Sequence, residues 1–128
     1  MTVLGDRAAS AEIPFRTSHT WAIPGEIKVA SGDTDYIPLF WVDVATGQSV
    51  KLVKMLHRIN SGTSATVKLQ KSGVDITGFT GVSVTTTGTV LDPADVALVA
   101  NDQLALIVTA VAGTPKNMSV TVVLEHLF

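Results

Sequence analysis

The chain is rich in residues whose side chains branch at the β carbon. It contains 18 valines, 16 threonines and 7 isoleucines, which together make up 41 of its 128 residues. Branching at this carbon stiffens the side chain and favours the pleated surface of a sheet. No apolar stripe of helical period runs for more than two turns, and the best candidate for a helical turn is the short segment Pro93–Ala100. The sequence therefore predicts an all-β fold.

Turn residues divide the chain into short apolar runs. This spacing is typical of an antiparallel β-sandwich with a jelly-roll-like arrangement, and it predicts about eight strands in two packed sheets. Pro38 lies inside the second run, and since proline has no N–H to donate, that strand is expected at a sheet edge or a bulge. The predicted strands are Glu26–Ala30, Asp35–Val44, Val50–Asn60, Ala65–Gln70, Val74–Phe79, Val82–Thr87, Gln103–Ala112 and Asn117–Leu127.

The last two predicted strands differ in how many of their faces are apolar. In Asn117–Leu127, apolar residues alternate with mostly polar ones, which indicates one buried face. In Gln103–Ala112, by contrast, both faces are mostly apolar. A strand of that kind is central in its sheet, or its outer face is covered by a partner. Together with the low content of charged residues, 16%, this favours a homo-oligomer.

Residues 1–19 show no strand or helix period and are predicted to form an extended N-terminal arm, followed by a single sandwich domain over residues 20–128. Ordering nineteen residues costs backbone entropy that the few apolar side chains of the arm do not offset. We therefore expect a neighbouring chain to hold the arm, for instance by strand addition. Deletion of residues 1–18 is expected to leave a folded domain that fails to assemble. The apolar anchors available are Val3, Leu4, Ile13 and Phe15.

Composition excludes several classes of function. Lys and Arg number 9 against 11 Asp and Glu, and a net charge of −2 argues against a nucleic-acid partner, which needs a basic face. No run of 18 apolar residues is present, so insertion into a membrane is not expected, and the N-terminus lacks a signal-peptide pattern. The absence of cysteine excludes disulfides, thiolate zinc sites and a cysteine nucleophile.

Motifs of catalysis and cofactor binding are missing as well. The sequence contains no nucleophile elbow, no phosphate-binding glycine loop and no zinc-protease motif. The histidines, His19, His57 and His126, are far apart and lack ligand spacing. We therefore expect no enzymatic activity, no cofactor and no metal.

Two groups of side chains leave alternatives open. Aspartates near turns could bind calcium, but aspartate at a turn more often caps backbone amides. These are Asp33 and Asp35 in one turn, and Asp92, Asp95 and Asp102 with Asn101 near another. Three aromatic residues could form a surface contact such as a sugar-stacking platform, although packing in the core or an interface is the simpler interpretation. They are Trp21, Tyr36 and Trp41.

Several segments resemble small β-sandwich virion proteins of tailed bacteriophages, particularly those of actinobacterial hosts. The similarity covers about residues 20–127 and is carried by turns and strand edges, so it supplies no site residues. The segments are Trp21–Gly25, Ser31–Pro38, His57–Leu69, Thr109–Asn117 and Leu124–His126.

The resemblance implies a non-enzymatic structural protein located in the virion, assembled in the host cytoplasm. It points first to a minor tail protein at the tail or tail tip, in contact with other virion proteins and with host surface glycans as a further candidate partner. Among oligomeric states it favours a trimer. A capsid decoration protein is the main alternative, and a carbohydrate-binding module is a second, because sandwiches support all three roles.

Overall fold

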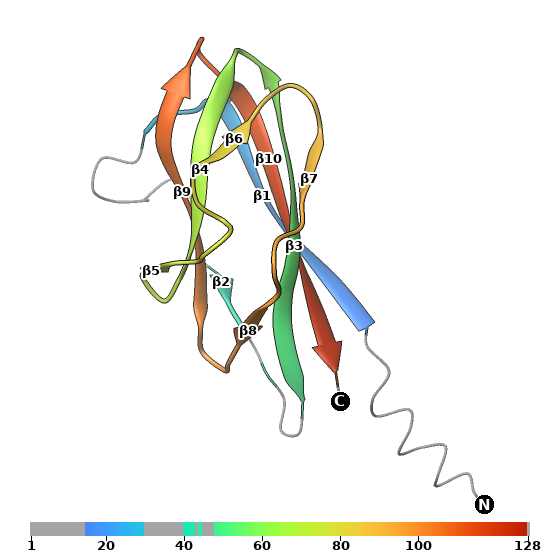
Figure 1. Cartoon of the computed structure of the whole chain (residues 1–128). Helices are drawn as coiled ribbons and strands as arrows, with labels where there is room; N and C mark the ends of the chain where they lie inside the picture. The colour runs from blue at the N-terminus through green and yellow to red at the C-terminus, as the bar shows by residue number, and fades with distance from the viewer. Residues whose placement is uncertain (1–14, 30–39, 43, 45–47, 128) are drawn as a thin grey trace, which may run out of the picture.

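The computed structural model describes residues 15–29, 40–42, 44 and 48–127, and these form two packed antiparallel sheets (Figure 1). Sheet A has the order β1-β10-β3, with two short strands, β7 and β8, on the far side of β3. Its strands are β1 (Phe15–Glu26), β3 (Ser49–Ser61), β7 (Thr89–Leu91), β8 (Val96–Leu98) and β10 (Lys116–Leu127).

Sheet B has the order β2-β9-β4, with β5 and β6 both pairing with β4. Its strands are β2 (Phe40–Trp41), β4 (Ser64–Lys71), β5 (Val74–Asp75), β6 (Val82–Val84) and β9 (Gln103–Ala112). The described residues contain no helix, and so no helix long enough to span a membrane is found among them. The predicted all-β sandwich of antiparallel strands is confirmed.

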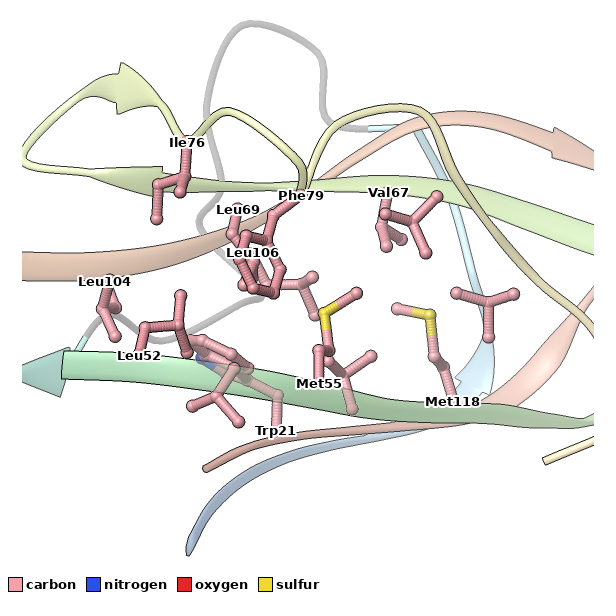
Figure 2. Packing of buried hydrophobic residues seen from close by; sticks show 14 of the residues in the cluster. Trp21, Leu52, Met55, Val67, Leu69, Ile76, Phe79, Leu104, Leu106 and Met118 are labelled. Atoms are coloured by element: carbon pink, nitrogen blue, oxygen red, sulfur yellow. The ribbon is translucent and has the colours of Figure 1, made fainter. Parts of the chain in front are cut away.

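The core lies between the sheets and consists almost entirely of apolar side chains. On β10, Met118, Val120 and Val122 are fully buried, whereas Ser119 between the first two is exposed. This alternation is the one predicted for the C-terminal strand, because successive residues of a strand point to opposite faces. Figure 2 shows how side chains of sheet A, such as Met55, meet those of sheet B, such as Leu106.

Strands β3, β4, β9 and β10 lie close to their predicted bounds, and the other segments differ. β9 has the bounds predicted for it, while Pro93–Ala100 contains strand β8 in place of a helical turn. The strand expected at Glu26–Ala30 is not formed by its described residues, because Glu26 ends β1 and Ile27 is buried without strand pairing. Its N–H instead donates to the Pro115 carbonyl at 2.9 Å. The run Asp35–Val44 lies mostly outside the described residues.

The boundary between the predicted arm and the domain falls inside a strand. β1 begins at Phe15, which pairs with His126, and the ladder continues without a break to Ile23. The arm as predicted, residues 1–19, is therefore wrong for residues 15–19, which belong to sheet A. Because the side chains of residues 15–20 are exposed or half-buried, they carry no hydrophobic alternation that sequence reasoning could detect. Residues 1–14 lie outside the described part of the chain.

Candidate assembly surfaces

Three of the five segments that carry the virion-protein resemblance meet at one end of the sandwich, the upper end in Figure 1: Trp21–Gly25, His57–Leu69 and Thr109–Asn117. Leu124–His126 lies at the other end of β10, beside the start of β1, and Ser31–Pro38 lies outside the described residues. At the upper end, the turn between β3 and β4 lies against the connection between β9 and β10. The Thr63 N–H donates to the Ala112 carbonyl at 3.2 Å, which joins the two turns. The end of β1 joins them through the Gly25 N–H, which donates to Asn117 Oδ1 at 2.7 Å. We call this arrangement the hairpin end.

Close backbone approach at the hairpin end requires glycine at two positions. Gly62 has φ +94°, and a β carbon there would lie 2.5 Å from the Pro115 Cα and 2.7 Å from the Thr114 carbonyl oxygen. Gly113 has φ +65°, and its β carbon would collide with the Thr63 side chain. Because both contacts are made by the two turns on each other, the turns interlock and fix the relative position of the two hairpins.

The anchors predicted for the arm and the three predicted surface aromatics do not form one site in the described part of the chain. Val3, Leu4, Ile13 and Tyr36 lie outside them, and of Trp41 only the backbone is described, in β2. Phe15 is 43% exposed, and its ring stacks on His126 with centroids 4.8 Å apart. Trp21 is only 4% exposed, so its assignment as a surface aromatic contact is wrong and the alternative of core packing applies.

Two of the histidines lie together on neighbouring strands of sheet A. The Thr17 hydroxyl is 2.9 Å from His126 Nε2 and 3.4 Å from His19 Nε2. Burial lowers the pKa of His19, and the charge of the His126 ring lowers it further. The His19 ring is therefore harder to protonate than a free imidazole, at the end of the β1–β10 ladder where β1 begins.

The third histidine, His57, is separate from this pair. It is 5% exposed, lies on β3 opposite Thr89 and Val120, and its Nδ1 has no hydrogen-bond partner among the described residues. Burial lowers its pKa, since a charged ring in the core would lose its hydration. The sequence correctly predicted that His57 shares a face with Met55 and Ile59. It could not show that Nδ1 has no hydrogen-bond partner among the described residues.

The aspartates considered for calcium are dispersed among ordinary interactions. Asp102 accepts hydrogen bonds from the Val99 N–H at 2.8 Å and from the Ser72 hydroxyl at 3.3 Å. Asp95 forms an ion pair with Lys51 at 3.1 Å, and Asp33 and Asp35 lie outside the described residues. Where the structure describes the chain, no three metal-binding side chains are grouped. Asp102 therefore follows the turn-capping alternative.

A row of charged side chains crosses the outer face of sheet A at the end where β10 finishes. Arg16 pairs with Glu125 at 3.1 Å, and Lys51 lies 3.6 Å from the same carboxylate and 3.1 Å from Asp95. The hydrogen bond and charge of Asp95 raise the pKa of Lys51, with a smaller contribution from Glu125. The row is electrically balanced, with two cations against two anions.

The outer face of β9 is partly covered from within the chain. Ala105 is 7% exposed and pairs with Gln70, and the half-buried Ile107 pairs with Lys68 on the same face. The polar ends of both β4 side chains bind Asp75, at 2.9 Å from Gln70 and 3.0 Å from Lys68. Long polar side chains can cover apolar surface with their stems in this way. The apolar outer face of β9 is thus partly covered within the chain itself and requires a second copy less than its sequence pattern indicated.

Comparison with known proteins adds neither a family nor a role. No protein-family model matches the chain. A search of curated proteins also found no match. Similar solved structures include the globular domain of zebrafish complement 1qA protein, at 12% identity and TM-score 0.43, covering 87% of this chain and 95% of that one.

Two other similar structures come from different settings. One is from the acid-stable capsid of Helicobacter pylori bacteriophage KHP30, at 11% identity and TM-score 0.47, covering 90% of this chain and 94% of that one. The other is a family 35 carbohydrate-binding module from Clostridium thermocellum, at 13% identity and TM-score 0.42, covering 86% and 97%. At these values the fold assignment rests on the strand pairing of the chain itself.

Proposed function

We propose that this protein is a non-enzymatic structural component of a bacteriophage virion, a minor tail protein of the tail or tail tip. The observation that carries the proposal is the position of the resembling segments. His57–Leu69 and Thr109–Asn117 form the two interlocked turns, and Trp21–Gly25 joins them at the hairpin end. Three of the five resembling segments thus form one structural unit at the hairpin end.

A building-block role also suits the surface chemistry. Of the large apolar side chains, Phe15, Val90 and Val111 are among those at least 40% exposed, on different strands of both sheets. Repetition of one interface by symmetry allows a small domain to bury enough area for stable assembly. We therefore include a homo-oligomer, with a trimer favoured by the resemblance, in the proposal.

The test is to locate the protein in particles. Antibodies raised against the purified full chain would be used for gold labelling of particles released by cells that carry the gene, with mass spectrometry of the same particles. Labelling of the tail or its tip is expected. Labelling over the shell would replace the proposal by a capsid decoration role, and absence from purified particles would overturn a virion role altogether.

A further inference from the structure

The outer face of sheet A carries two cations that form no ion pair with a carboxylate of the described residues. Beyond the balanced charged row, three rows of cross-strand neighbours point outward, because residues paired across strands share a face. Lys54 and Arg58 are the charged residues in these rows, and neither forms an ion pair with any described residue. The rows are Ser18–Val123–Lys54, Thr20–Thr121–Leu56–Val90 and Ala22–Ser119–Arg58.

The same face is hollowed and partly apolar. A depression of about 340 Å³ is lined by Leu56, Arg58 and Val90 together with small polar residues of β10. Ser119 forms part of this lining and also of a second depression, of about 400 Å³, that extends along β1 past Ala22. Leu56 is 36% exposed and Val90 55%. We call this surface, from Lys54 to Arg58 with its two depressions, the cationic face.

We propose that the cationic face docks an acidic segment of another virion protein, so that carboxylates meet Lys54 and Arg58 while apolar side chains pack on Leu56 and Val90. The inference rests on the proposed role in a particle. Complementary charge at an interface steers encounter and fixes which partner binds. The chain has a net charge of −2, so an acidic partner would be attracted to this face and not to the protein as a whole.

Other occupants fit the face less well. A two-fold contact with a second copy would bring the cationic face against itself and place like charges together. A nucleic acid needs many phosphates neutralised, and only two uncompensated cations are present among the described residues of the face. Bases and sugars are commonly bound by stacking on aromatic rings, and the three rows contain no aromatic side chain.

The experiment measures binding of short fluorescent peptides to the purified full chain by anisotropy. The probe alternates glutamate with leucine, and a matched peptide alternates lysine with leucine. The double variant Lys54→Gln/Arg58→Gln removes the charges of the face. The double variant Lys28→Gln/Lys71→Gln removes the same charge elsewhere and is the control, with melting curves to show that both remain folded.

Loss of the two charge contacts is expected to weaken binding of the glutamate peptide about tenfold or more in the Lys54/Arg58 variant, and about twofold or less in the control. Binding should also weaken as salt is raised from about 0.1 M to 1 M, where screening shortens to about 3 Å. Equal loss in both variants, or tighter binding of the lysine peptide, would overturn the proposal.

Sedimentation without peptide tests the second-copy alternative. Self-association that the Lys54/Arg58 variant abolishes would assign the face to another copy of the chain and overturn the acidic partner. The proposed function is tested separately, since it depends on particle labelling. Labelled particles with no peptide binding would remove the cationic face as a docking surface and leave the virion role intact.

Discussion

Replacement of Gly62 by alanine isolates the energetic contribution of the interlocked turns. Two costs are expected. A non-glycine residue at φ +94° is strained by about 1–2 kcal/mol. The new β carbon would also meet the Pro115 Cα at 2.5 Å, and a forced backbone shift in a packed region costs about 1–3 kcal/mol more.

Gly73 provides a matched control for the conformational cost. Its φ is +84°, and a β carbon there meets nothing within 4 Å. Gly73→Ala should therefore lose only about 1–2 kcal/mol, from backbone strain alone. The difference between the two variants measures the close approach of the turns, with the effect of positive φ largely cancelled.

The assay is urea unfolding followed by circular dichroism, with calorimetry as a second measurement. The free energy of unfolding of Gly62→Ala is expected to lie about 1–3 kcal/mol below that of Gly73→Ala. For a domain of this size that corresponds to a melting temperature lower by about 3–15 °C. Equal losses in the two variants would refute the conclusion that backbone contact between the turns fixes the hairpin end.

Three further predictions concern pH, a turn cap and the N-terminus. Because burial lowers the pKa of His57 below its ordinary 6.5, the unfolded chain binds more protons in acid. The free energy of unfolding should thus be level above pH 6.5 and fall as the pH drops below it. The fall should be less steep in His57→Leu, where only the lowered pKa of His19 still contributes, and parallel pH profiles of the two proteins would contradict this. Asp102→Ala should lower the free energy of unfolding in urea by about 1 kcal/mol, because the Val99 amide loses its acceptor. Asp92→Ala, at an exposed position, is the control and should be nearly neutral. Equal losses in the two variants would argue against the cap. Deletion of residues 1–14 should leave the melting temperature near that of the full chain. Deletion of residues 1–18 also removes four paired positions of β1 and should lower the melting temperature. Equal melting curves for the two deletions would argue against the observed start of β1.

The prediction from sequence agrees best with the structure where the hydrophobic period and the turn residues point to the same strand. The bounds of β9 and the buried face of β10 follow from alternation that can be seen in the sequence, because a strand between two sheets must send apolar residues to one side. The β-branched composition was likewise sufficient for the all-β class. By contrast, β1 could not be placed at Phe15, since the side chains of residues 15–20 are exposed or half-buried and show no such period.

Other properties depend on which strands become neighbours in space. The residue types of Lys54, Leu56 and Arg58 are visible in the sequence, but the position of the two cations on one face, without an ion pair to any described carboxylate, depends on the pairing of β3 with β10 and β7. Trp21 is as suitable for a surface as for a core until the pairing of β1 with β10 turns its side chain toward the space between the sheets. The sequence by itself determined the fold class and the buried faces of the long strands, because local periodicity encodes them. Only the tertiary structure decided the interlocked turns, the burial of His57 and the uncompensated charges of the cationic face, because each depends on contacts between segments distant in the chain.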